Sequence, residues 1–194
     1  MKTFLSELRT ALLLTAVFAV LLCGVYPLAV WAGAQALFPA RANGSIVTDP
    51  DGTVRGSALL GQFFASDKYF HSRPSAAGAG YDATSSSGTN LGPTSQKLAD
   101  SIKAAVAAYR TSNHLAPDAP VPADAVTSSA SGLDPHISLT NAQLQAPRVA
   151  KTRHLPLATV TALITAHTDD RDLHIFGEPA VNVLLLNRAI DQLR

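Results

Sequence analysis

The chain has almost no cysteine and few charged residues, and both shortages exclude classes of protein. Its single cysteine, Cys23, lies inside an apolar N-terminal run, so the rest of the 194 residues can form no disulfide. Thiolate metal sites and cysteine redox chemistry are therefore excluded. Charged residues make up only 15% of the sequence, and the net charge is +1 at pH 7. A nucleic-acid-binding protein needs clustered Lys and Arg to neutralise phosphates, so the scattered basic residues argue against that function.

Motifs of catalytic chemistry are also missing. The sequence has no G-x-x-x-x-G-K-[ST] phosphate loop, no Asp-Lys-Thr-Gly-Thr phosphorylation motif and no G-x-S-x-G nucleophile elbow. Ser131, Asp134 and His136 lie too close in sequence to resemble a hydrolase triad, whose members converge from distant segments. The six histidines show no metal-ligand spacing such as H-E-x-x-H. We therefore expect no catalytic machinery, no metal site and no bound cofactor in this chain.

One long apolar segment is present near the N-terminus. No charged residue occurs between Thr10 and Ala40, and Ala11–Trp31 is nearly continuously apolar, about the twenty residues that a membrane-spanning helix needs. Lys2 and Arg9 precede this run, which favours a cytoplasmic N-terminus. We predict a cytoplasmic segment at residues 1–9, a transmembrane helix at 10–32 and an extracytoplasmic domain at 33–194.

A cleaved signal peptide is the alternative interpretation of this segment. Ala32-Gly33-Ala34 and Ala34-Gln35-Ala36 both resemble the small-residue sites at which such peptides are cut. Signal peptides have apolar regions of about 7–15 residues, whereas the run here is longer, which favours a retained anchor. One helix without ionisable side chains lines no ion pathway by itself, so any transport belongs to partner subunits.

The rest of the chain predicts one mixed domain. Ser45–Thr48 and Thr53–Gly56 flank a turn that contains Pro, Asp and Gly, and this arrangement predicts a hairpin. Leu59–Phe64 and Leu173–Phe176 each predict a short strand. Between them, Arg73–Pro93 is rich in Gly, Ser, Ala and Thr and predicts a long loop.

Helices are predicted in the second half of the chain. The first is marked by apolar residues at helical spacing, which are Leu98, Ile102, Val106 and Tyr109. A second begins with Ser138 as its cap and runs towards Arg153, with Pro147 expected to interrupt or kink it. A third follows Pro156, and a C-terminal helix carries Leu184, Leu185, Ile190 and Leu193. Because strands and helices are segregated rather than alternating, the predicted class is α+β, a single N-terminal transmembrane helix followed by one mixed extracytoplasmic domain.

Short segments dense in polar residues, glycine and proline recur along the domain in a defined order. They are Gly61-Gln62, Tyr69-Phe70, Arg73-Pro74-Ser75-Ala76, Ser87-Gly88-Thr89-Asn90-Leu91-Gly92-Pro93, Ser131-Gly132-Leu133-Asp134-Pro135-His136-Ile137-Ser138, Pro147-Arg148-Val149-Ala150-Lys151, Gly177-Glu178-Pro179 and Val181-Asn182-Val183-Leu184-Leu185-Leu186-Asn187. Together with the N-terminal anchor, this ordered set resembles the signature of KdpC, the C subunit of the Kdp-type potassium-transporting ATPases.

The resemblance marks a set of residues as structural or partner-contact candidates. These are Tyr69, Phe70, Arg73, Pro74, Ser75, Asn90, Gly92, Ser131, Gly132, Asp134, His136, Ser138, Arg148, Asn182 and Asn187. For Asp134 and Ser138 the favoured role is turn and cap chemistry. The planar forks of Arg73 and Arg148 suit fixed contacts either across the domain or to a partner subunit, and the sequence leaves both alternatives open.

The resemblance also implies a function. It implies an accessory subunit of a high-affinity, ATP-driven potassium uptake complex in the cell (inner) membrane, needed for assembly and stability. The implied partners are the channel-like subunit KdpA, the P-type ATPase subunit KdpB and the small subunit KdpF. KdpC subunits are described as catalytic chaperones that support ATP binding by the P-type subunit, so ATP and potassium would act at the level of the complex. Two alternatives are an exported small-ligand-binding module and an exported hydrolase using Ser131 and His136.

Overall fold

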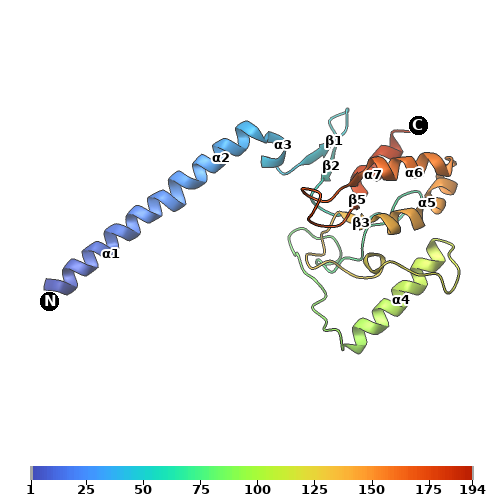
Figure 1. Cartoon of the computed structure of the whole chain (residues 1–194), viewed down its shortest axis with the longest axis horizontal. Coiled ribbons are helices and arrows are strands. Elements are labelled where there is room, and N and C mark those ends of the chain that lie inside the picture. Colours follow the sequence, from blue (N-terminus) through green and yellow to red (C-terminus); the bar gives the residue numbers. More distant parts are fainter. Residues whose placement is uncertain (1, 194) are drawn as a thin grey trace. The chain divides into compact units, whose positions relative to one another are not determined.

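The computed structural model describes residues 2–193 and divides the chain into two compact units. The first unit, Met1–Ser57, consists of a long helix followed by a hairpin. The second, Ala58–Arg194, is a domain that mixes helices with a small sheet (Figure 1). The predicted α+β class, with one long apolar helix followed by a mixed domain, is confirmed.

The N-terminal helix has the length and composition to cross a membrane. Helix α1 (Lys2–Val20), a π-helical turn (Leu21–Val25) and helix α2 (Tyr26–Leu37) follow one another directly. Within them, Thr3–Leu37 forms an apolar stretch of 35 residues. At about 1.5 Å per residue it is roughly 52 Å long, which exceeds the ~30 Å hydrocarbon core of a bilayer. The helix therefore runs past both ends of the predicted 10–32 segment.

The π-helical turn ends two residues before Pro27. Proline has no N–H group, and its ring clashes with the carbonyl four residues earlier, so it disturbs the hydrogen bonds of the helical turn before it. Here the Tyr26 N–H group donates to the Leu21 carbonyl, five residues back, so the turn is one residue wider than in an α-helix. After α2, the short helix α3 (Pro39–Ala42) completes the helical part of this unit.

The first unit ends in the predicted hairpin. Strands β1 (Ile46–Thr48) and β2 (Val54–Ser57) pair antiparallel, with Val47 opposite Gly56. The Asp49 N–H group donates to the Thr53 carbonyl over 2.9 Å, and Gly52 takes a left-handed backbone (φ 84°) that suits glycine. The hairpin prediction is thus confirmed.

The second unit is built from helices around a three-stranded sheet. Its elements are α4 (Gln96–Ser112), the 3-10 helix η2 (Ala123–Ala125), β3 (His136–Ser138), α5 (Leu139–Arg153), α6 (Leu157–Ala166), β4 (Thr168–Asp169), β5 (Ala180–Asn182) and α7 (Val183–Asp191). The strand order is β3-β5-β4, with both pairs antiparallel. The core joins α5, α6, α7 and the sheet, and Phe70 enters it from a long irregular segment.

Polar caps start three of these helices, as helix termini require. The Ser95, Ser138 and Asn182 side chains accept hydrogen bonds from backbone N–H groups in the first turns of α4, α5 and α7. All four predicted helices of the domain are confirmed, including the Ser138 cap. Helix α5 continues through Pro147 to Arg153, so Pro147 does not interrupt it, and the alternative of a kink there stays a prediction.

Two predicted strands are wrong. Leu59–Phe64 forms no strand. The Gly61 N–H group donates to the Leu133 carbonyl, but this single bond is not continued into a ladder of strand hydrogen bonds. Leu173–Phe176 is a tight turn, because Leu173 (φ 52°) and His174 (φ 60°) both have left-handed backbones that an extended strand excludes. The strand lies further on, at Ala180–Asn182. The predicted loop at Arg73–Pro93 is confirmed.

Candidate functional site

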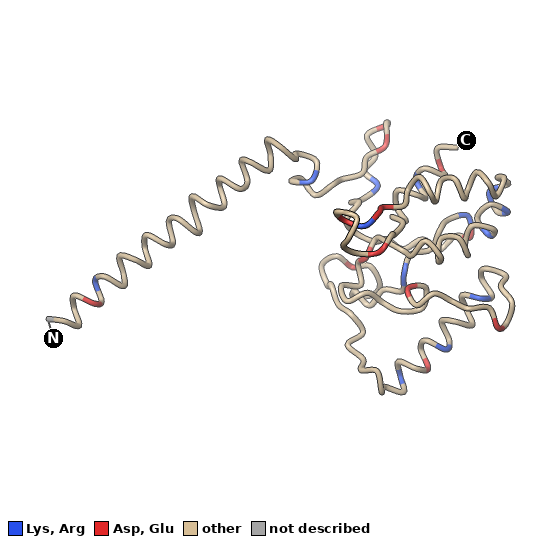
Figure 2. Tube along the Cα trace, viewed as in Figure 1, with Lys and Arg blue, Asp and Glu red and all other residues tan. Residues whose placement is uncertain are grey.

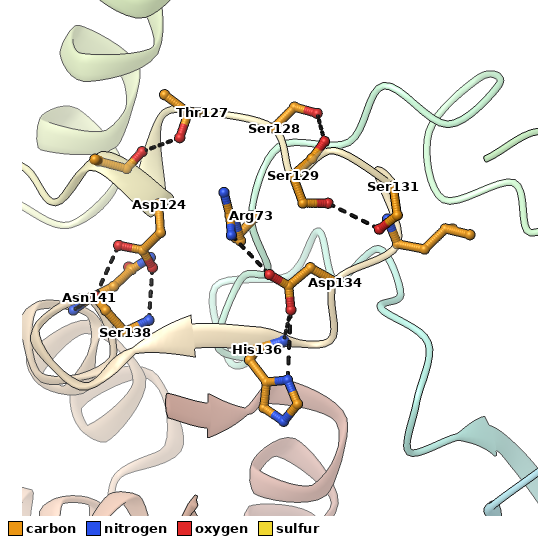
Figure 3. Close-up of polar contacts among 12 residues, drawn as sticks. Arg73, Asp124, Thr127, Ser128, Ser129, Ser131, Asp134, His136, Ser138 and Asn141 are labelled. Atoms are coloured by element: carbon orange, nitrogen blue, oxygen red, sulfur yellow. Dashed lines mark hydrogen bonds and ion pairs between the residues drawn. The ribbon is translucent and has the colours of Figure 1, made fainter. Parts of the chain in front are cut away.

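A chain of charged side chains joins the segment at residue 73 to the sheet. Arg73 lies in the long irregular segment, and its Nη1 atom donates to Asp134 Oδ2 over 2.8 Å. The other Asp134 oxygen accepts from the His136 backbone N–H group over 2.9 Å and lies 3.6 Å from His136 Nδ1 (Figure 3). The other ring nitrogen of His136 lies 3.4 Å from Asp169 Oδ2 on β4. His136 is the first residue of strand β3.

The pKa values of this cluster are displaced by its own contacts. The Asp134 hydrogen bond, together with the charges of Asp134 and Asp169, raises the pKa of His136 above 6.5, although partial burial opposes this. Burial raises the pKa of Asp134, but hydrogen bonds from His136 and the Arg73 guanidinium outweigh burial and lower it below 3.8. Near neutral pH the cluster therefore favours an ionised Asp134 beside a histidine that holds its proton more tightly than usual.

This cluster predicts a pH dependence of stability. Protonated His136 stabilises the fold fully below its unfolded pKa near 6.5, and this contribution is lost as pH rises through the raised folded pKa. Ionised Asp134 also stabilises the fold, and this contribution is lost as pH falls through its lowered pKa. The contributions of His136 and Asp134 are therefore lost in different pH ranges. We expect His136→Gln to flatten the decline in stability above pH 6.5. Urea unfolding of the full chain at several pH values measures this, with His114→Asn at an exposed position as the control. An unchanged decline in His136→Gln would contradict the assignment.

A second polar network is buried beneath helix α5. Arg148 is 3% exposed, and its guanidinium donates to Asn113 Oδ1 and Gln145 Oε1 over 3.0 and 2.8 Å. The same guanidinium donates to the backbone carbonyls of Asp67 and Tyr69 over 2.6 and 3.0 Å. Burial lowers the pKa of Arg148. An arginine guanidinium nevertheless stays charged, and here fixed acceptors hold it in place. For Arg73 and Arg148 the sequence left open whether they contact this domain or a partner subunit. In the structure both make contacts across the domain.

The network continues to the start of helix α5. Gln145 accepts from the His71 N–H group and donates to the Asn141 side chain over 2.7 and 2.9 Å. Asp124 accepts from the Ser138 hydroxyl and from Asn141 Nδ2, both over 2.9 Å (Figure 3). Loop segments around residues 71 and 124 are therefore bonded to one helix.

The remaining predicted residues fasten irregular segments to the helices. Asn187 on α7 accepts from the Phe70 N–H group over 2.8 Å and donates to the Phe70 carbonyl over 2.9 Å, while the Tyr69 hydroxyl donates to Asp191. Asn182 donates to the Ala58 carbonyl over 2.8 Å. The first part of the domain is thus bonded at several points to its last helix.

A third set of bonds joins the loops around residues 75 and 131. The Ser75 hydroxyl donates to the Gly132 carbonyl over 2.6 Å and accepts from the Tyr81 N–H group. Gly132 has a left-handed backbone (φ 67°), and a Cβ there would lie 2.6 Å from the Ser87 carbonyl oxygen, so only glycine fits. The Ser131 hydroxyl lies beside Ser129 and the Leu133 N–H group, and the His136 ring contacts two carboxylates instead.

A cleft of ≈ 680 Å³ lies between α4, the segment at residues 63–81 and α5. Its lining includes Phe63, Tyr81, Tyr109, Arg73 and Gln145. Burial raises the pKa of Tyr109 above its ordinary value. Most polar groups in the lining are already bonded, but the buried Arg73 Nε atom has no hydrogen-bond partner among residues 2–193. The walls of the cleft are largely apolar.

Most of the predicted residues converge in these networks, and a few do not. Pro74 lines the cleft without a polar role, and Asn90 and Gly92 are exposed in the loop before α4. Sequence reasoning missed several members of the networks, namely Asn113, Asp124, Asn141, Gln145 and Asp169. A signal existed for α5, because Asn141, Gln145 and Arg148 are spaced to share one face of a helix.

Chemically, the arrangement fixes irregular segments in place. Across residues 2–193 no three His, Cys, Asp or Glu side chains gather where they could hold a metal ion. Backbone carbonyls and N–H groups of the loops are the main partners of the buried side chains. The result is a set of irregular segments fastened by hydrogen bonds to the helices of the domain.

Comparisons with known proteins agree along nearly the whole chain. The family described as KdpC, K+-transporting ATPase, c chain, matches residues 8–192. A potassium-transporting ATPase KdpC subunit from Caulobacter vibrioides is 56% identical over 187 residues, covering 96% of this chain and 93% of that protein. The subunit of the same name from Mycobacterium tuberculosis is 54% identical over 187 residues, covering 96% of this chain and 98% of that protein.

Proposed function

The chain belongs to the KdpC family, the c chains of K+-transporting ATPases, and from this premise we propose how it serves such a complex. It is a non-catalytic accessory subunit that holds the potassium uptake complex together through its membrane helix and its folded domain. The observation that carries this proposal is the match at 54–56% identity over 96% of the chain, which includes both helix and domain.

The proposed topology places the domain outside the cytoplasm. Residues 1–9 lie in the cytoplasm, 10–32 cross the inner membrane and 33–194 form the extracytoplasmic part. Arg9 directly before the proposed membrane-crossing residues 10–32, and the scarcity of positive charge directly after them, support this orientation. The exposed apolar side chains of α1 and α2 are available for lipid or for helices of partner subunits.

The proposed partners are the channel-like subunit KdpA, the P-type subunit KdpB and the small subunit KdpF. Potassium and ATP are handled by these partners. The catalytic-chaperone role, support of ATP binding by the P-type subunit, then requires coupling through protein contacts, because the bilayer separates this domain from cytoplasmic ATP. Such coupling means that the chain favours one of two conformations of its partners, and that ATP favours the same one.

The alternative functions have less support. A hydrolase would need Ser131 beside His136, but the Ser131 hydroxyl contacts Ser129 and the His136 ring contacts Asp134 and Asp169. A small-ligand-binding module has the cleft of ≈ 680 Å³ in its favour. That cleft offers a ligand mainly apolar walls, and a ligand that bound it would have to be recognised by shape and by Arg73.

Co-purification tests the proposal. The full chain with a C-terminal tag is expressed with the other subunits of its own complex and purified in mild detergent. We expect the channel-like and P-type subunits to be recovered with it. A variant in which the first 37 residues are replaced by an unrelated single-span helix controls for membrane insertion alone. Recovery of the chain by itself, or of a shortened soluble form, would contradict the accessory role and revive the signal-peptide alternative.

A further inference from the structure

The segment Asp169–Glu178, called here the Asp169–Glu178 loop, begins at the last residue of β4, leads towards β5 and exposes large apolar side chains. All ten residues of Asp169–Glu178 are exposed. Leu173, Ile175 and Phe176 are 80%, 69% and 63% exposed, within four positions of one another. Single exposed apolar residues are common on protein surfaces, but a cluster of three at a loop tip indicates a contact surface.

This loop is also held in a fixed shape. The Asp172 N–H group donates to the Phe176 carbonyl over 2.8 Å, and the Phe176 N–H group donates back over 2.9 Å. Arg171 pairs with Glu178 over 2.6 Å across the base of the loop. Leu173 and His174 adopt left-handed backbones, which are unfavourable for such residues. Strain of this kind persists where it serves a function, and a loop that is already ordered loses less entropy when it binds.

The charge of the loop narrows the choice of partner. Its formal charge is −3, from four carboxylates against the single guanidinium of Arg171. Glu178 pairs with Arg171 and Asp169 lies 3.4 Å from His136, so Asp170 and Asp172 carry the charge that a partner would meet. Figure 2 shows acidic positions predominating along this loop. An anionic lipid surface would repel it. A second copy of the chain docking through the same loop would place like charges together. A protein surface with basic residues around an apolar recess complements both the apolar side chains and the negative charge of the loop.

We propose that the Asp169–Glu178 loop docks into an apolar recess, rimmed by Lys or Arg, on the extracytoplasmic face of a membrane-embedded protein subunit. Leu173, Ile175 and Phe176 fill the recess, and the carboxylates of Asp170 and Asp172 meet its basic rim. The proposal rests on the proposed function, which supplies partners on the same side of the membrane, and adds the element through which the domain engages one of them.

Photocrosslinking in the assembled complex identifies what the loop touches. Phe176 is replaced by benzoylphenylalanine in the full chain, which is expressed with the other subunits and irradiated in membranes. The matched control carries the same group at Leu157, which is 49% exposed on α6. We expect an adduct with one partner subunit from position 176 and none, or a different one, from position 157. Adducts only with lipid, only with a second copy of the chain, or with nothing would overturn the docking proposal.

A loop variant measures how much the contact contributes. We expect L173S/I175S/F176S to recover about tenfold less of the partner subunits than wild type, because exposed anchors of this kind carry much of an interface's binding energy. D170K/D172K should weaken recovery too, whereas Leu157→Ser should not. Resistance of the chain to limited proteolysis should persist in all variants, because the changed side chains are exposed. Equal recovery by wild type and the triple variant overturns the docking proposal alone. Absence of partners with wild type overturns the proposed function and this inference with it.

Discussion

Replacing Phe70 by Ala is expected to lower the free energy of unfolding of the domain by about 3–5 kcal/mol, the usual cost of emptying a buried phenylalanine site. Phe70 is 0% exposed, although it lies in a segment without regular structure. It packs into the core formed by α5, α6, α7 and the sheet. Its backbone is bonded on both sides to Asn187, so the segment cannot easily shift to fill the space. Chemical denaturation of the full chain in mild detergent measures the loss.

Phe63 provides a matched control for this variant. It has the same side chain in the same irregular segment but is 75% exposed. We expect Phe63→Ala to change stability by less than about 0.5 kcal/mol. Limited proteolysis should also separate the two, with cleavage between residues 58 and 81 appearing early in Phe70→Ala only. Equal stability of the two variants would mean that this segment is not fastened to the core through Phe70.

Replacing Arg148 by Ala is expected to cost about 2–4 kcal/mol of stability, because several hydrogen bonds from one charged donor are lost together. The guanidinium donates to the backbone carbonyls of Asp67 and Tyr69 and to the side chains of Asn113 and Gln145. The Asn113 and Gln145 acceptors are buried, so they are left without this donor in a dry environment when the arginine is removed. Removing a buried charge recovers some desolvation energy, which keeps the net loss below the sum of the bonds. The same denaturation experiment measures this cost.

Arg148→Lys distinguishes geometry from charge. Lysine keeps the positive charge but not the planar fork, so it cannot serve all four acceptors, and we expect it to lose more than about 1 kcal/mol. Lys151→Ala, an exposed position on the same helix, should be neutral within about 0.5 kcal/mol. A fully stable Arg148→Lys variant would show that the charge, not the fork, holds the loops.

The helices of the domain were predictable because local signals mark them. Ser138 precedes an amphipathic run and caps α5, and the spacing of Leu98, Ile102 and Tyr109 predicts α4. Continuation of α5 through Pro147 was not predictable, because the packing of α5 against α6 and the core overrides the local preference of proline. Local sequence signals predict a conformation poorly where tertiary packing determines it.

The strands and the site were less predictable for the same reason. The apolar run at Leu173–Phe176 satisfies a strand pattern, yet a left-handed backbone turns it out into solvent. The contacts of Arg73 and Arg148 depend on partners tens of residues away, such as Asp134 and Asn113, which no spacing rule connects. Only the ordered signature segments pointed to these residues as a set.

The most direct test of the accessory role is the potassium-stimulated ATPase activity of the purified complex, measured over a range of ATP concentrations with and without this chain. We expect activity to fall to background without the chain and to return when the full chain is restored. If the chain also supports ATP binding, a complex carrying the loop variant should need more ATP for half-maximal rate. A complex that lacks the chain yet keeps full potassium-stimulated activity and unchanged ATP dependence would contradict the account.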